Sequence, residues 1–192
     1  ANQTIAENRL TQVNAGAYVQ EQVGYRNYLF ATVGLRFDKH SAFGASAGAA
    51  LYPKFSLSFV PSDLPGWDSE KLSAFRLRGA IGQSGLQPGA FDKFTTFSPL
   101  ASSAGPGVQP QNLGNPDLKP EVSTEWEMGT EVGLFSNRAA FNFTYWNRTV
   151  TDVLVARQFP PSGGFTNTQL DNLGELKAWG LEIGLNGSLV NR

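Results

Sequence analysis

The sequence VSTEWEMGTEVGL, which runs from Val122 to Leu134, alternates strictly between two kinds of residue. One set is apolar or threonine and includes a tryptophan and a methionine, while the other is glycine, serine or glutamate. The glutamates are Glu125, Glu127 and Glu131. Successive side chains of an extended chain point to opposite sides, so this pattern predicts a β-strand with one apolar and one polar face.

The same alternation recurs on both sides of this stretch. We expect about seven strands, and several exceed the usual five or six residues. They are Leu10 to Val23, Tyr28 to Asp38, Lys54 to Val60, Ser73 to Gly82, Val122 to Leu134, Ala139 to Val155 and Trp179 to Leu189. Within Ala139 to Val155, Trp146 falls on the polar face, so either the strand has a bulge there or the Trp146 ring has a role in a lumen. The fold class is therefore all-β, with antiparallel up-and-down strands.

The connections between these strands alternate in length. They are short near 24–27 and 136–138 and intermediate at 61–71, but long at 39–53, 84–120 and 158–174. Every second connection of an up-and-down sheet lies at the same end. One rim therefore carries tight turns and the other carries long loops, which is the asymmetry of outer-membrane barrels.

The apolar face has two possible environments. In a soluble sandwich it packs against a second sheet, whereas in a transmembrane barrel it meets lipid and the polar face lines a lumen. Periodicity alone does not separate these cases. The strand lengths and the loop asymmetry favour part of a large transmembrane β-barrel wall.

The composition excludes several classes of function. Charged residues make up 16% of the chain, against about 25% in an average soluble domain, and the net charge is −1. Nucleic-acid binding needs clustered basic residues, so none is expected. With no cysteine and a single histidine, His40, beside Lys39 in a polar loop, the sequence predicts no metal site and no cofactor. No apolar run approaches the roughly 20 residues of a membrane-spanning helix.

Several stretches, taken in chain order, resemble the barrel segment of SusC/RagA-type TonB-dependent receptors. The strongest match is Gly114 to Glu121, which is similar to the GNPDLKPE stretch that opens a barrel strand in these receptors. The others are Tyr28 to Asp38 with Ser41 to Gly44, Tyr52 to Ser56, Leu77 to Gly85, Gly133 to Arg138, and Asn172 to Glu175 with Gly180 to Glu182.

This resemblance implies a bacterial outer-membrane receptor that imports oligosaccharides or peptides with energy delivered by TonB. It implies four partners: outer-membrane lipid, the remainder of the barrel with its plug, TonB acting through that plug, and a SusD-like lipoprotein. Barrels of this family have 22 strands around a plug. Residues 1–192 are therefore expected to be a partial barrel domain without a plug, from the C-terminal part of a longer receptor. The stretch Ala1 to Thr4 shows no signal peptide, and Leu189 to Arg192 shows no terminal aromatic residue.

Two other classes of function remain to be weighed. A sheet derived from a barrel is able to serve as a structural or interaction module, with its apolar face buried against a protein partner instead of lipid. An outer-membrane enzyme is the third class, but no nucleophile accompanies the carboxylates, so we expect no enzymatic activity.

The charged residues on the polar faces are the first group of candidate site residues. Residues two apart on a strand point the same way, so Glu125, Glu127 and Glu131 are expected to face the lumen. Arg76 and Arg78 alternate in the same manner on another strand and are candidate partners for these glutamates.

Aromatic residues in the long loops are the second group. Phe91, Phe94 and Phe97 lie in a loop rich in glycine, proline and serine, and Phe165 lies in a later loop. Such rings stack on sugars or pack against a protein, so these four are candidate ligand contacts; the alternative is that they fold the loops onto the barrel rim. For Asp117 to Glu121 we favour a simple connection from loop to strand, because proline suits the first position of a strand.

Overall fold

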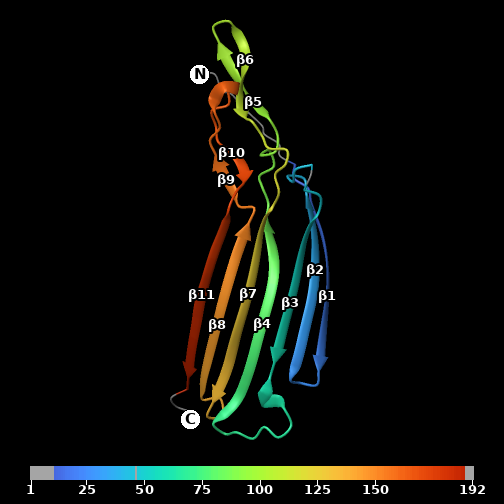
Figure 1. Cartoon of the computed structure of the whole chain (residues 1–192), viewed down its shortest axis with the longest axis vertical. Coiled ribbons are helices and arrows are strands. Elements are labelled where there is room, and N and C mark those ends of the chain that lie inside the picture. Colours follow the sequence, from blue (N-terminus) through green and yellow to red (C-terminus); the bar gives the residue numbers. More distant parts are fainter. Residues whose placement is uncertain (1–10, 46, 189–192) are drawn as a thin grey trace, which may run out of the picture.

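A computed structural model describes residues 11–45 and 47–188 and shows one curved antiparallel sheet (Figure 1). Its seven strands follow the order β1-β2-β3-β4-β7-β8-β11. Their bounds are Asn14–Tyr25 (β1), Leu29–His40 (β2), Ala50–Phe59 (β3), Leu72–Leu86 (β4), Glu121–Leu134 (β7), Ala139–Thr151 (β8) and Glu175–Gly187 (β11). This up-and-down sheet confirms the predicted fold class.

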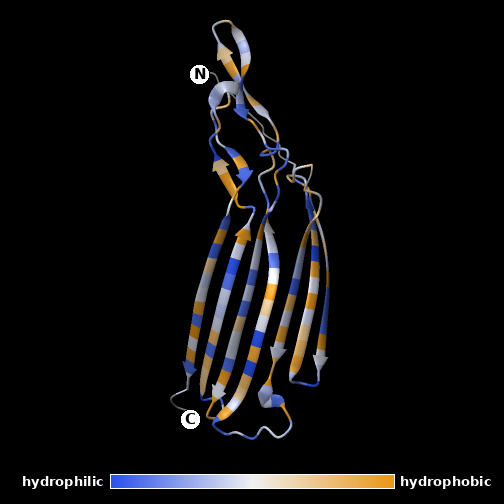
Figure 2. Ribbon diagram, in the orientation of Figure 1, coloured by the Kyte–Doolittle hydropathy of each residue, from blue (hydrophilic) through white to orange (hydrophobic). Residues whose placement is uncertain are grey.

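The register of the strands extends the alternation across the whole sheet. Residues directly opposite each other on neighbouring strands share a face. Thr130 lies opposite Leu77 on β4 and Phe143 on β8, and Phe143 in turn lies opposite Ile183 on β11. Apolar residues therefore gather on one side, and Figure 2 shows the resulting alternation of colour along each strand.

The apolar face carries Val19, Val23, Leu29, Val33, Leu35, Phe55, Leu57, Phe75, Leu77, Ile81, Trp126, Met128, Val132, Phe141, Phe143, Tyr145, Trp179, Leu181, Ile183 and Leu185. The polar face carries Thr32, Lys54, Ser56, Arg76, Arg78, Ser84, Ser123, Glu125, Glu127, Glu131, Asn142, Thr144, Trp146, Arg148 and Glu182.

No second layer covers the apolar face within the described part of the chain. Side chains such as Ile183, 66% exposed, and Leu185, 77% exposed, have no second layer of protein packed over them. The buried hydrophobic residues of residues 11–45 and 47–188 are Ala42, Phe43, Tyr52 and Leu118, and they lie at one end of the sheet. The sheet is thus a wall without a core of its own.

Aromatic residues bound the apolar face at two levels. Tyr145 contacts Trp126 and Trp179, with ring centroids 5.2 and 6.4 Å apart. At the other end, Tyr28 makes edge-to-face contacts with Tyr25 and Phe59. From Trp126 to Leu134 the strand is about 27 Å long at roughly 3.4 Å per residue, close to the ~25 Å apolar band of outer-membrane barrels and their aromatic girdles.

Connections of two kinds lie at opposite ends of the sheet (Figure 1). The turns from β1 to β2 and from β7 to β8 are tight and place Arg26, Phe135, Ser136 and Asn137 at positive φ. The link from β3 to β4 is longer and contains a short 3-10 helix, Pro61–Asp63. The segments joining β2 to β3, β4 to β7 and β8 to β11 all lie at the other end, here called the rim. The predicted loop asymmetry is therefore present in the structure.

Several predicted boundaries were wrong. The strand predicted from Lys54 begins at Ala50 and passes through Pro53, although proline usually marks the start of a strand. The strand predicted to reach Val155 ends at Thr151, because Asp152 has a φ of 55° and turns the chain. His40, predicted as a solvated loop residue, is the last residue of β2 and is buried. Its Nδ1 accepts a hydrogen bond from the Ala42 amide.

The long rim segments, predicted as loops, contain four further strands. Strands β5 (Thr96–Ser102) and β6 (Gly105–Asn112) form a hairpin between β4 and β7. Strands β9 (Leu154–Arg157) and β10 (Gln169–Asn172) pair with each other between β8 and β11, separated by a 3-10 helix, Pro161–Gly163. In Figure 1 the β5–β6 hairpin stands farthest from the sheet.

The described residues hold no helix that is both long and apolar enough to span a membrane. The first strand, predicted from Leu10, begins at Asn14, and the last, predicted to reach Leu189, ends at Gly187. The features expected of Ala1 to Thr4 and of Leu189 to Arg192 lie outside the described residues.

Candidate functional site

The predicted charged residues meet on the polar face of β4, β7 and β8. Arg78 Nη1 lies 3.3 Å from Glu127 Oε1, and its Nε lies 3.5 Å from Glu131 Oε1. Arg76 Nη1 lies 3.7 Å from Glu131 Oε2. Arg78 Nη2 also donates a hydrogen bond to the Thr144 hydroxyl (2.6 Å). Arginines from one strand therefore neutralise the glutamates of the next.

Glu125 has a partner that sequence reasoning did not identify. Its carboxylate accepts a hydrogen bond from Arg148 Nε, and the two residues lie directly opposite each other on β7 and β8. With this pair, each of the three predicted glutamates of β7 forms an ion pair with an arginine on a neighbouring strand.

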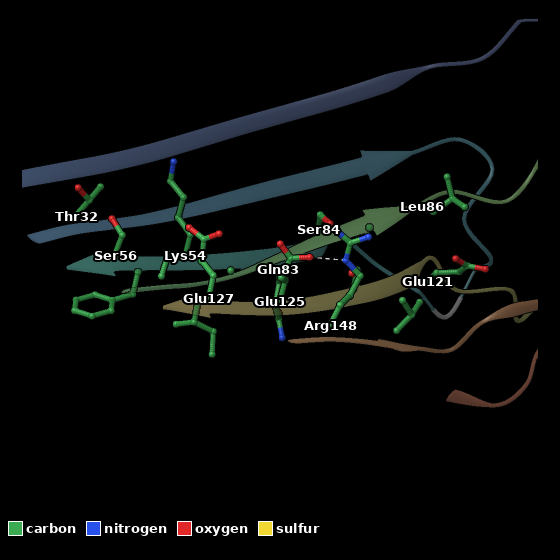
Figure 3. Close-up of a pocket in the computed structure, with 17 residues that line it drawn as sticks. Thr32, Lys54, Ser56, Gln83, Ser84, Leu86, Glu121, Glu125, Glu127 and Arg148 are labelled. Atoms are coloured by element: carbon green, nitrogen blue, oxygen red, sulfur yellow. Dashed lines mark hydrogen bonds and ion pairs between the residues drawn. The ribbon is translucent and has the colours of Figure 1, made fainter. Parts of the chain in front are cut away.

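A trough of about 720 Å³ lies on the polar face, near the end of the sheet that carries the rim (Figure 3). Small residues line it, among them Ser56, Ala80, Gly82 and Ser84. Lys54 and the Glu125–Arg148 pair also line it. Its volume falls within the ~300–1,000 Å³ typical of ligand pockets.

Lys54 is the one basic residue of the trough that lacks an ion pair within the described residues. It lies opposite Gly34 on β2 and Gly82 on β4, neither of which has a side chain to meet it. Its aliphatic stem runs over Gly34, where an added methyl group would lie 2.9 Å from Lys54 Cγ. Within residues 11–45 and 47–188, no carboxylate lies within 4 Å of its ammonium group.

Trp146 belongs to the polar face without any bulge. The pairing of β7 with β8 runs in continuous register, and Trp146 lies opposite Glu127 and Gly180. Its indole covers Gly180, where an added methyl group would lie 2.6 Å from the ring. The Arg148 guanidinium lies 5.8 Å from the ring centroid, within range of a cation–π interaction. The structure therefore excludes a bulge at Trp146 and places its ring on the polar face.

The stretch from Gly114 to Glu121 does more than start β7. The Gly44 amide donates a hydrogen bond to the Leu118 carbonyl (2.8 Å), and the Ala45 amide donates to the Pro116 carbonyl (3.1 Å). On its other side, Asn172 Nδ2 donates to the Lys119 carbonyl (2.9 Å). This stretch therefore joins all three rim segments, which the sequence did not reveal.

Leu118 is the apolar centre of this rim network. Its side chain is fully buried, as is Ala42, while Phe43 is 5% exposed. Lys93 Nζ, from the segment between β4 and β7, donates hydrogen bonds to the Ser41 and Phe43 carbonyls (2.5 and 2.9 Å). The fully buried side chains of Ala42 and Leu118 thus lie among the loops and do not pack under the sheet.

The four loop phenylalanines separate into two groups. Phe97 and Phe165 contact each other across two rim segments, with ring centroids 6.0 Å apart. Phe91 and Phe94 remain 56% and 50% exposed, and Lys93 Nζ lies 5.0 Å from the Phe94 ring centroid. The first pair joins two loops, although Phe97 is itself 55% exposed, and the second pair is available at the surface.

A double-mutant cycle measures the contact between the first pair. We expect Phe97→Ala and Phe165→Ala to be coupled by about 0.5–1.5 kcal/mol, the usual range for an aromatic pair. Hydrogen exchange of the β5–β6 and β9–β10 amides in the full-length receptor gives the free energy of loop opening for each variant. The control cycle combines Phe91→Ala with Phe165→Ala, because these two rings are not in contact in the structure. If the effects are additive in both cycles, the contact between Phe97 and Phe165 contributes nothing to loop closure.

The described part of the chain shows no group of three or more histidine, cysteine, aspartate or glutamate side chains arranged to hold a metal ion. The polar face carries ion pairs, hydroxyl groups, the ammonium group of Lys54 and the carboxylates of Glu121 and Glu182, and these last three have no ion pair within the described residues. Such a surface is suited to binding a polar molecule.

The sheet consists of long antiparallel strands, with an apolar face that no second layer covers and a charged opposite face. Tight turns lie at one end and long loops at the other. These features define a segment of a transmembrane β-barrel wall. The family described as "TonB dependent receptor-like, beta-barrel" matches residues 1–190, and the chain belongs to this family. This confirms the resemblance seen in the sequence. It also confirms the bacterial outer membrane as the location.

Two receptors from Formosa agariphila are similar to this chain. "TonB-dependent receptor P26" is 28% identical over 205 residues, covering 99% of this chain and 20% of the receptor. "TonB-dependent receptor P3" is 29% identical over 145 residues, covering 67% of this chain and 14% of the receptor. The chain therefore spans a fifth or less of the length of these two relatives.

Solved structures show the same fold. The RagAB peptide transporter matches with a TM-score of 0.85 and 23% identity, over 93% of this chain and 20% of that one. The siderophore receptor PirA from Pseudomonas aeruginosa matches with a TM-score of 0.66 and 22% identity, over 93% of this chain and 32% of that one. The family is one of receptors and transporters.

Proposed function

We propose that this chain is a wall segment of a receptor that imports nutrients across the outer membrane. The observation that carries this proposal is the joint position of the rim and the trough. The long loops gather at one end of the sheet, and the trough lies on the polar face near that same end. A molecule captured by the loops would therefore meet the trough on entering the barrel.

The remainder of the receptor is part of this proposal. Strands β1 and β11 each have one unpaired edge in the sheet, and an unpaired edge within hydrocarbon costs several kcal/mol per exposed backbone group. We therefore assign residues 1–192 to a partial barrel domain that closes with further strands around a plug. TonB would act through that plug, and a SusD-like lipoprotein would cover the rim.

The cargo is assigned as an oligosaccharide or a peptide. Support comes from the exposed rings of Phe91 and Phe94 at the rim, which suit stacking on sugars or packing against peptide side chains. The RagAB relative in fold is described as a peptide transporter. On the polar face, Arg76, Arg78, Glu125, Glu127 and Glu131 would face the barrel lumen. We assign no catalytic step to this segment.

Orientation in the membrane is the first test. Single cysteines are introduced into the full-length receptor at Ser103, between β5 and β6, and at Ser136, in the β7–β8 turn. Ser103→Cys is expected to react with a membrane-impermeant maleimide on intact cells, whereas Ser136→Cys reacts only after the outer membrane is permeabilised. The reverse pattern would refute the proposed direction of import.

Transport itself is tested by uptake. Cells that express the receptor are supplied with pooled labelled oligosaccharides and, separately, with pooled labelled peptides. Uptake of one pool is expected to fall to background when the receptor gene or TonB is removed. If neither deletion changes the uptake of either pool, the proposed function is refuted.

A further inference from the structure

We infer that the trough on the polar face binds a carboxylate group of the cargo, with the Lys54 ammonium group as its anchor. This inference rests on the proposed function, because it concerns the molecule that this receptor imports. It adds a chemical class of ligand and the residue that selects it.

The charge balance of the trough singles out Lys54. The other charged residues that line the trough are already engaged. Glu125 forms an ion pair with Arg148, and Glu127 forms one with Arg78. The Glu121 carboxylate accepts a hydrogen bond from the Leu154 amide (2.7 Å). Glu121 keeps its negative charge but lies at the rim end of the trough, opposite Leu86, whereas Lys54 lies opposite Gly82. An incoming carboxylate beside Lys54 therefore meets the neutralised Glu125 and Glu127 and one cation without an ion pair.

The neighbours of Lys54 leave room for a ligand. Gly34 and Gly82 lie opposite it, so no side chain stands directly across from Lys54 on β2 or β4. Thr32, Ser56 and Ser84 line the same trough with hydroxyl groups that are able to donate hydrogen bonds. Figure 3 shows the Lys54 side chain projecting from the sheet beside this row.

The position of the trough favours cargo over the receptor's own plug as the source of the carboxylate. Its lining residues include Ser84 and Leu86 at the end of β4, and Glu121 and Ser123 at the start of β7. These are the strand ends that continue into the rim segments. The trough therefore opens toward the side from which cargo arrives.

Two pairs of probes test this inference on the full-length receptor purified with its lipoprotein. The first pair is an N-acetylated neutral hexapeptide with a free or an amidated C-terminus. The second pair is tetragalacturonate and its carboxyl-reduced, neutral counterpart. We expect the carboxylate member of one pair to bind about 10- to 100-fold more tightly than its neutral counterpart, as for a hydrogen bond to a charged group. The pair that responds identifies the source of the carboxylate.

Substitutions then assign the effect to Lys54. Because Lys54 has no ion pair in the described chain, Lys54→Gln removes no internal partner. It is expected to abolish the preference for the carboxylate while leaving the affinity for the neutral member within about threefold. Lys54→Arg retains the preference. Lys177→Gln is the control. Lys177 lies near the start of β11, on the same side of the sheet as Trp179, and is paired with Glu175. This substitution is expected to leave both affinities unchanged.

Three outcomes would overturn the inference. The wild-type receptor shows no preference for either carboxylate; or Lys54→Gln keeps the preference; or Lys54→Gln weakens both members of a pair equally and lowers the melting temperature. The last result would mean that Lys54 binds an acidic group of the plug. The proposed function is judged separately by the uptake experiment, so either conclusion is able to fail alone.

Discussion

Ile183→Arg is expected to destabilise the folded receptor in the outer membrane by about 2–4 kcal/mol, the cost of an arginine on the lipid face near the bilayer midplane. Ile183 is 66% exposed on the apolar face and shares a cross-strand row with Leu77, Thr130 and Phe143. This row lies about midway between the aromatic level at Trp126 and the end of β7 at Leu134. The fraction of receptor that runs as the folded form in unheated gel samples, at increasing temperature, measures the loss.

Asn142→Arg is the matched control. Asn142 lies on β8, the strand next to β11, but on the polar face, where Arg76 and Arg78 are also found. An arginine there meets water and the nearby Glu131, so the change is expected to stay within about 0.5 kcal/mol. If Ile183→Arg is as well tolerated as Asn142→Arg, lipid does not cover the apolar face. The chain would then be better described as an interaction module with a protein partner.

The strands and their faces are predictable from the sequence because both follow from local periodicity. In the stretch from Val122 to Leu134 every second residue differs in polarity, so the β-strand and its two faces follow without knowledge of the neighbours. The same argument placed Arg76 and Arg78 on one face. It also identified Trp146 as an aromatic residue on a polar face, which the unbroken register of β7 and β8 explains.

The rim and the trough depend on contacts that a single sequence does not contain. Leu118 is buried by a loop more than 70 residues earlier in the chain. Lys54 lacks a partner only because the registers of β2 and β4 place glycines opposite it. The hairpin of β5 and β6 escaped prediction since Pro99, Pro106 and Pro110 are unfavourable in strands.

Gly44→Ala is expected to have the second large effect, because it opens the rim network. A methyl group at Gly44 would lie 2.9 Å from both the Leu118 amide nitrogen and the Leu118 carbonyl oxygen, and would also clash with the Pro116 carbonyl. These are backbone atoms and are unable to swing aside. The loop must separate, so two hydrogen bonds at Pro116 and Leu118 are lost and the Leu118 side chain is exposed. The expected cost is about 3–5 kcal/mol for closing the rim.

Hydrogen exchange of the Gly44 and Ala45 amides, which donate those two bonds, gives the result directly. Their protection is expected to fall by about 100-fold or more, while amides in the centre of β7 and β8 keep theirs, because local opening leaves the barrel wall intact. Gly107→Ala in β6 is the control, since the nearest atom to its added methyl group is the Leu100 carbonyl oxygen at 3.8 Å. Equal protection in both variants would show that the Gly114 to Glu121 stretch does no more than start a strand. Loss of protection throughout the sheet would show instead that the barrel wall depends on the rim.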